Sequence, residues 1–159
     1  MLVGVDEAGR GTLFGPVCAG AVVWDPNVCS KCIRDSKKMS RKQRSIVKEY
    51  IEQNAIDYGV GLASAAEVDS LNIRNATFLA MHRALDNVKE KITNIEVDGN
   101  AFIQYQDISY ECIVKGDASC VHIAAASILA KVYHDECILQ MIRDTPSLDV
   151  YSLDTHMGY

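Results

Sequence analysis

The stretch LVGVDEAGRG, residues 2–11, joins a short apolar run to two acids, two glycines and an arginine. Residues 2–5 predict a buried strand, and Asp6 and Glu7 fall where that strand ends. Adjacent side chains on a regular strand point to opposite faces, so the two acids can share one site only if the strand bends or Glu7 reaches around. Acids followed by a flexible turn that carries a cation suit a divalent metal and a phosphate held side by side.

The bulk composition favours a single globular domain. The chain has 159 residues, of which 48% are hydrophobic, enough for an ordinary core. It has no apolar run of membrane-spanning length and no basic leader followed by an apolar stretch. We therefore expect a soluble, cytoplasmic protein that does not enter a membrane, and we expect a monomer.

Cysteine spacing leaves one alternative function open. A domain with an ordinary core does not need disulfides, so we expect the six cysteines to be free thiols. The pairs Cys29 with Cys32 and His134 with Cys137 both have the spacing of metal ligands, and together they could supply four zinc ligands. A zinc-stabilised interaction module is therefore an alternative hypothesis.

Basic residues concentrate in one segment of an acidic chain. The net charge is −5, yet residues 31–48 hold eight of the 16 Lys and Arg residues and a single acid, Asp35. A basic patch on an acidic body is typical of a protein that binds a polyanion. The simpler interpretation of the same pattern is a solvated helix face.

Hydrophobic periodicity predicts an α/β protein with a mixed central sheet flanked by helices. Capping-box pairs, Ser40 with Gln43 and Ser64 with Glu67, mark the starts of two helices. The short connection between the first two strands favours an antiparallel pair. Expected strands cover residues 2–6, 17–24, 56–62, 94–98 and 110–114, and the longer helices cover 73–92 and 123–141.

Asp98 and Asp117 also lie just beyond predicted strands and beside glycine, as Asp6 and Glu7 do. Singly, each could be a turn or helix-cap residue. Four carboxylates at one sheet edge would repel one another unless divalent cations lay between them, and all-oxygen ligands favour Mg²⁺ or Mn²⁺. Two such ions about 4 Å apart can activate water and stabilise the leaving oxygen in phosphodiester hydrolysis.

The ordered motifs of the chain resemble those of ribonuclease HII, a type 2 ribonuclease H. They are GVDEAGRG at 4–11, DSKK at 35–38, LNI at 71–73, VDG at 97–99, KGD at 115–117, AAASILAK at 124–131 and HMGY at 156–159. The resemblance implies a ribonuclease H-like fold. It also implies cleavage of the RNA strand of RNA/DNA hybrids and nicking 5′ of ribonucleotides embedded in duplex DNA, which leaves a 3′-hydroxyl and a 5′-phosphate and serves DNA repair.

The resemblance also implies roles for individual residues. Those aligned with the metal-binding catalytic carboxylates are Asp6, Glu7, Asp98 and Asp117. Gly9, Arg10 and Gly11 align with the turn that reads the 2′-hydroxyl and contacts the phosphate, and Tyr159 aligns with a tyrosine that packs against the neighbouring deoxyribose. Lys37, Lys38 and the basic face after Ser40 would hold the nucleic-acid backbone without sequence preference.

Three departures from the family pattern carry expectations of their own. Thr12 replaces a common proline and is expected to loosen the turn, and Met157 replaces a common lysine. The family usually continues into further helices, whereas this sequence ends at Tyr159, so we expect a single catalytic domain over 1–159 that lacks them. A second alternative is therefore a hybrid-binding protein with weak catalysis.

Overall fold

The computed structural model describes residues 1–12 and 15–151 of the chain. The elements are β1 (Leu2–Ala8), β2 (Val17–Val23), η1 (Ser36–Lys38), α1 (Arg41–Asn54), β3 (Asp57–Ala63), α2 (Ala65–Leu71), α3 (Ile73–Asp86), β4 (Asn94–Asp98), β5 (Ser109–Ile113), α4 (Gly116–Ser119), α5 (Val121–Asp144) and η2 (Pro146–Tyr151). The predicted order of strands and helices is confirmed.

The strands form one five-stranded sheet in the order β3-β2-β1-β4-β5. β1 pairs antiparallel with β2 and β2 with β3, whereas β1 pairs parallel with β4 and β4 with β5. The predicted mixed sheet and the antiparallel first pair are therefore both correct. β1 lies at the centre, where the two kinds of pairing meet.

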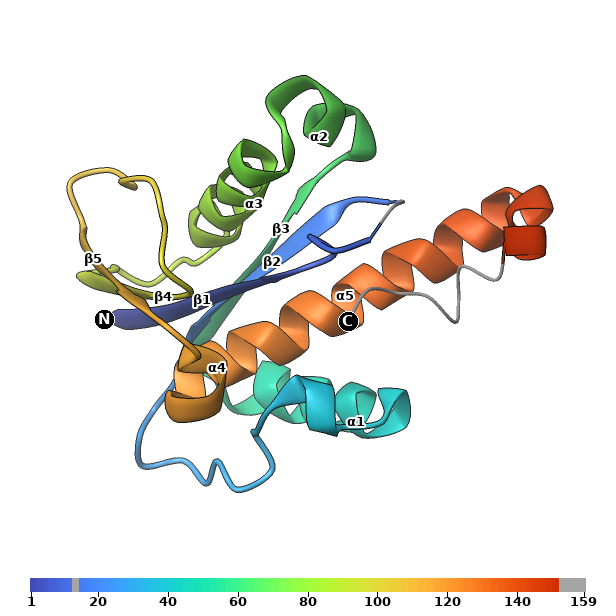
Figure 1. Cartoon of the computed structure of the whole chain (residues 1–159). Helices are drawn as coiled ribbons and strands as arrows, with labels where there is room; N and C mark the ends of the chain where they lie inside the picture. The colour runs from blue at the N-terminus through green and yellow to red at the C-terminus, as the bar shows by residue number, and fades with distance from the viewer. Residues whose placement is uncertain (13–14, 152–159) are drawn as a thin grey trace.

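Helices cover both faces of this sheet, with α3 on one side and α5 with α1 on the other (Figure 1). Val3 and Val5 of β1 pack into the core beneath α3, together with Ile95 and Val97 of β4. The opposite core joins α1 to α5 through Val47, Ile51, Ile128 and Leu129. Because side chains alternate along a strand, the residues between those valines face α5. This places Gly4 and Asp6 on the α5 side.

Local signals set most helix ends. Both predicted capping boxes are present, at Ser40 and at Ser64. The prediction that α3 reaches residue 92 is wrong, because the helix ends at Asp86. The Asp57 carboxylate accepts hydrogen bonds from the backbone amides of Lys89 and Glu90, which holds the chain in a loop there.

α5 lies directly on the backbone of the sheet at two glycines. A Cβ atom at Gly4 would collide with the backbone of His122, and one at Gly20 would collide with the carbonyl of Ala126. Gly20 is the register partner of Asp6 across the β1–β2 pair. The two glycines therefore fix the depth at which α5 presents its side chains to the end of β1.

No helix within residues 1–12 and 15–151 is long and apolar enough to cross a membrane. The monomeric state, the cytoplasmic location and the single domain over 1–159 stay predictions.

Candidate active site

The four predicted carboxylates come together at one edge of the sheet, from β1, β4 and α4. Asp6 and Asp117 are buried, with exposed fractions of 5% and 6%. The backbone amide of Glu7 donates to Asp6 Oδ1 at 2.7 Å, and the amide of Asp117 donates to Asp98 Oδ1 at 3.3 Å. The sequence-based expectation that these residues converge agrees with this geometry.

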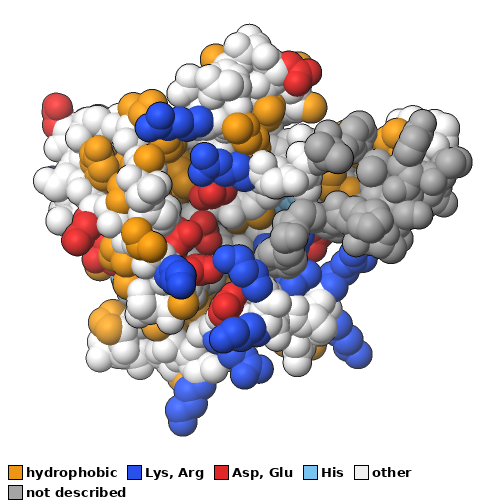
Figure 2. Space-filling view, in the orientation of Figure 1, with side chains coloured by type: hydrophobic (Ala, Val, Ile, Leu, Met, Phe, Trp, Pro, Cys, Tyr) orange, Lys and Arg blue, Asp and Glu red, His pale blue; other side chains and the backbone are white. Residues whose placement is uncertain are grey.

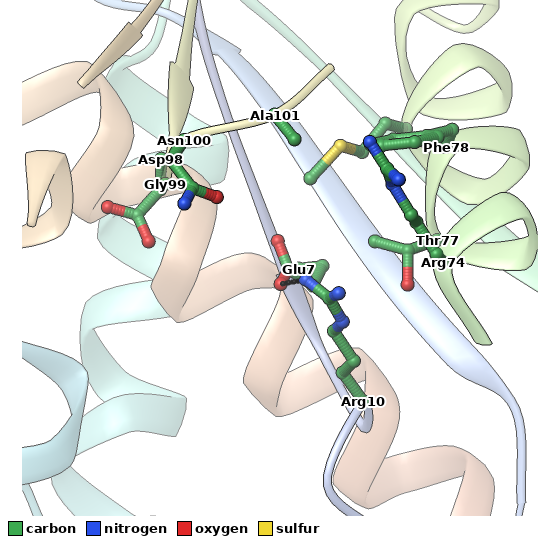
Figure 3. Close-up of a pocket in the computed structure, with 10 residues that line it drawn as sticks. Glu7, Arg10, Arg74, Thr77, Phe78, Asp98, Gly99, Asn100 and Ala101 are labelled. Carbon is green, nitrogen blue, oxygen red and sulfur yellow. Dashed lines mark ion pairs between the residues drawn. The ribbon is translucent and has the colours of Figure 1, made fainter. Parts of the chain in front are cut away.

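Glu7 reaches the shared site without a bend at the acids. β1 stays regular through Ala8, where it still pairs with β2, but its pairing with β4 ends at Val5 opposite Val97. Beyond Val5 the two strands no longer pair, and Glu7 lines both hollows at this end of the sheet together with Asp98. Figure 3 shows Glu7 and Asp98 on two sides of the same hollow.

Negative charge accumulates in this cluster. Burial raises the pKa of Asp6 well above its usual value, and the charges of Glu7 and Asp98 raise it further. Burial also raises the pKa of Glu7, although Arg10 acts in the opposite direction. The pKa of Asp98 is raised as well, again mainly by burial. Buried carboxylates that repel one another and offer only oxygen donors fit hard divalent cations such as Mg²⁺ or Mn²⁺.

Lys37 is the cation that touches Asp117. Its Nζ lies 3.3 Å from Asp117 Oδ2, while 61% of the Lys37 side chain stays exposed. Burial alone would lower the pKa of Lys37, but the charge of Asp117 and the hydrogen bond to it raise the value. The side chain sits on η1, whose N-cap Asp35 accepts from the Lys37 amide. An exposed lysine on this short helix can exchange its carboxylate partner for a phosphate.

The turn after β1 is tight at Gly9 and open at Gly11. Gly9 has a φ of +91°, and a Cβ there would collide with the ring of buried His134. A Cβ at Gly11 would meet nothing within 4 Å. Thr12, which was expected to loosen this turn, is tied to it by two hydrogen bonds: its hydroxyl donates to the Gly9 carbonyl at 2.6 Å, and its amide donates to the same oxygen. That the turn is looser than with proline stays a prediction.

Two adjoining hollows meet at Glu7, Arg10 and Asp98. The first, of about 560 Å³, extends toward α3 and is also lined by Arg74 and Asn100 (Figure 3). The second, of about 390 Å³, extends toward α5. On the surface, acidic side chains gather near the middle of the face in Figure 2, with Lys and Arg side chains around them. Such a surface allows cations to bind at the centre and a phosphate backbone to lie across the rim.

Ser127 and Lys131 of α5 line the second hollow, and neither was predicted as a site residue. The Ser127 hydroxyl faces Asp6 and favours its ionised form, and it lies 3.2 Å from the Ser36 hydroxyl. Lys131 is 2% exposed, and its Nζ lies 2.9 Å from Asp135 Oδ1. The sequence does contain a signal for them, namely polar residues inside the alanine-rich segment 124–131. Charged residues in a buried helix segment are rarely buried without a partner, so they indicate a polar site.

The predicted basic face on α1 is partly wrong. Arg44 is 7% exposed, donates to the carbonyls of Ser36 and Met39, and lies 3.6 Å from Asp135. Lys48 pairs with two glutamates rather than pointing away from the protein. Arg44 therefore holds η1 and α5 together and cannot contact nucleic acid.

The remaining predicted residues divide into three groups. Lys38 is exposed and lines a separate hollow beside Asp117. Tyr159 and Met157 lie outside the described residues. The zinc module is wrong: Cys29 is exposed and His134 is buried beneath Gly9, and no ligand group joins the two pairs within residues 1–12 and 15–151.

Comparison with known proteins gives a consistent result along the chain. The family model for ribonuclease HII matches residues 3–159. Ribonuclease HII of Bacteroides fragilis is 44% identical over 146 residues, which are 92% of this chain and 73% of that protein. The Christiangramia forsetii protein is 46% identical over 158 residues, which are 99% of this chain and 78% of that protein. The crystal structure of ribonuclease H2 from Pyrococcus horikoshii matches with a TM-score of 0.78 at 26% identity, covering 89% of this chain and 75% of that one.

Proposed function

The chain belongs to the ribonuclease HII family, a group of metal-dependent ribonucleases H, and from this premise we propose which residues carry the activity. Asp6, Glu7, Asp98 and Asp117 are the catalytic carboxylates in this proposal. The observation that supports it most strongly is that Asp6, Glu7 and Asp98 line adjoining hollows, while the Asp117 amide donates to Asp98 Oδ1 at 3.3 Å from α4. Carboxylates whose pKa values are raised by burial and by one another are typical of functional sites.

The same four carboxylates are proposed to hold two Mg²⁺ or Mn²⁺ ions. When bound, such ions supply positive charge to the scissile phosphate and acidify an attacking water. The protein fixes the donor positions: the Glu7 amide restrains Asp6, and the Asp117 amide restrains Asp98. Ser127 supports Asp6 from α5 in its ionised form.

The substrate is proposed to be an RNA/DNA hybrid or a DNA duplex with an embedded ribonucleotide. In this proposal, the turn of Gly9, Arg10 and Gly11 reads the 2′-hydroxyl, the group that distinguishes RNA from DNA. Arg10 lies 3.8 Å from Glu7 and is half exposed, so it can reach both the acid and an incoming phosphate. Gly11 leaves open space beside the turn for a sugar.

The exposed lysines of η1 are proposed to hold the phosphate backbone. Lys37 stands beside Asp117 and Lys38 lines the next hollow, so the two lie along one rim of the site. Tyr159 is proposed to pack against the deoxyribose that follows the ribonucleotide. These contacts add affinity that weakens with salt and carry no base sequence preference.

A nicking assay tests the proposal directly. The substrate is a labelled duplex with one ribonucleotide, and the matched control duplex has deoxyribose at that position. We expect a nick 5′ of the ribonucleotide in Mg²⁺ or Mn²⁺, none with chelator, and none in the control duplex. Asp98→Asn should abolish the nick at little change in volume, because it removes one ligand charge.

The same assay defines the result that would contradict the proposal and the result that would support its alternative. Folded wild-type protein that nicks neither this duplex nor an RNA/DNA hybrid in either metal would contradict the proposal. Tight binding to the ribonucleotide duplex without nicking would instead support the hybrid-binding protein with weak catalysis.

A further inference from the structure

A second group of metal ligands lies on the α5 face of the sheet, apart from the four carboxylates. We propose that Glu96, Cys120 and His122 form a binding site for a borderline transition-metal ion of the Zn²⁺ class. One ligand atom from each residue lies within 4.8 Å of the other two. All three residues are intermediate in exposure, so an ion can enter from solvent while the site excludes most water.

The backbone explains why these three side chains meet. Glu96 lies on β4, and its register partner on β1 is Gly4. His122, in the first turn of α5, lies over Gly4, where any side chain would collide with it. Its Nε2 thereby comes within 2.5 Å of Glu96 Oε2. Cys120 immediately precedes α5 and adds its thiol from the same end of the helix.

An ion pair alone accounts for only part of this arrangement. A Glu96–His122 pair needs no third partner, yet the Cys120 sulfur lies in the same small volume. The thiol does not cap α5, and its sulfur lies 3.7 Å from the Ser119 hydroxyl. A carboxylate, an imidazole and a thiol together are the donor set of zinc, whereas Mg²⁺ prefers oxygen alone.

The proposed site differs from the carboxylate cluster in its ligand number and its metal. Three protein ligands leave one position of a tetrahedral ion for water or another small ligand. An ion that enters would take the place of the His122–Glu96 hydrogen bond and bind the Cys120 sulfur as a thiolate, with release of the thiol proton to water. The sulfur and nitrogen donors of Cys120 and His122 would keep the metal selectivity of this site distinct from that of the all-oxygen cluster.

An ion here would join the two parts of the chain that carry half of the catalytic carboxylates. Glu96 lies two residues before Asp98 on β4, so both side chains leave the strand on one face. The Cys120 amide donates to the Gly116 carbonyl at 2.8 Å, across the short α4 that holds Asp117. Binding at this site would therefore stabilise the junction of β4, α4 and α5.

Cobalt substitution tests the site without any activity measurement. Full-length protein is stripped with chelator and titrated with Co²⁺ in excess Mg²⁺, and a thiolate-to-cobalt charge-transfer band is recorded. We expect one Co²⁺ bound through sulfur, displaced by Zn²⁺, and a rise in melting temperature on Zn²⁺ addition. Cys120→Ser should abolish the band. His122→Ala should weaken binding by about 100-fold, since even outer-shell changes cost about 10- to 100-fold.

Two further variants make the result decisive. The matched cysteine control is the double variant Cys29→Ser with Cys32→Ser, which should keep the band. Asp98→Asn should also keep it, so loss of the carboxylate site and loss of this site are separable. Absence of the band in folded wild-type protein would overturn the proposal, and so would a band that survives Cys120→Ser but disappears in the double variant.

Discussion

Asp6, near the end of β1, and Asp135, on α5, are both almost fully buried, but their neighbours have opposite charges. Asp6 shares its surroundings with Glu7 and Asp98, and its pKa is raised by burial and by those charges. Burial alone would raise the pKa of Asp135, yet the neighbouring His134 ring, Lys131 at 2.9 Å and Arg44 at 3.6 Å lower it. The structural acid is neutralised within the protein, whereas the acids of the proposed site leave charge for an external cation.

The largest expected effect is on catalytic activity, which should depend on Asp6. Asp6→Asn should lower the rate of cleavage by about 10³-fold or more. When catalytic residues act together, the loss of one removes most of the effect of the whole set. The melting temperature of the variant without metal should stay the same or rise, since the change removes a repelled buried charge. Single-turnover cleavage in Mg²⁺ and thermal denaturation measure the two quantities. Near-normal cleavage by this variant would remove Asp6 from the proposed site.

The reverse result is expected at the structural acid. Asp135→Asn should lower the free energy of unfolding by about 3 kcal/mol or more, because it removes the buried carboxylate charge that faces the buried cations Lys131 and Arg44. The matched control is Glu136→Gln, the next residue along α5, which is exposed and pairs with Lys48 at the surface, so it should change stability by less than about 1 kcal/mol. Urea denaturation measures both. Equal effects for the two variants would show that the buried pairing contributes nothing.

The carboxylate cluster around Asp6 and the paired acid Asp135 should contribute to stability with opposite dependence on pH. The raised pKa values of Asp6, Glu7 and Asp98 mean that the folded metal-free protein binds more protons than the unfolded chain above about pH 4, so stability falls as pH rises through that region. The lowered pKa of Asp135 gives stability that is present above its unfolded value and lost as pH falls. Asp6→Asn should flatten the decline at rising pH, as should added Mg²⁺. Unfolding curves at several pH values check this, and an unchanged slope in the variant would contradict it.

The smallest expected effect concerns Lys37 and Lys38, the exposed lysines beside the carboxylates of the proposed site. Lys37→Gln should reduce the slope of log K against log salt by about one for duplex binding, because it removes one phosphate contact. Lys38→Gln lies farther from the carboxylates and should change binding no more than Lys37→Gln does. Fluorescence anisotropy over a salt series measures both slopes, and a steeper slope in either variant would exclude a phosphate contact there.

Local signals made much of this molecule predictable. The capping boxes at Ser40 and Ser64 depend on atoms three residues apart, and the strand patterns depend on alternation along one segment. The convergence of the carboxylates followed from their places at strand ends and from the family resemblance. These features are encoded within a few residues of where they appear.

Other features depended on partners distant in sequence. The burial of Arg44 is decided by Asp135 on another helix, so the basic segment alone could not reveal it. The end of α3 is decided by Asp57, on a strand that precedes the helix. The place of the Glu7 side chain at the site depends on the point where β4 stops pairing with β1. Each required the three-dimensional arrangement rather than the local pattern.

Substitutions at Gly20 should impair activity, although glycine has no side chain that could take part in catalysis. It pairs with Asp6 in the sheet, and its lack of a side chain lets the Ala126 carbonyl rest on the strand, one residue before Ser127. Any larger residue would push α5 outward and move Ser127 from Asp6. In a genetic screen for lost nuclease activity, substitutions at Gly20 would therefore cluster with those of the carboxylates, although this residue has no side chain with which to touch a substrate.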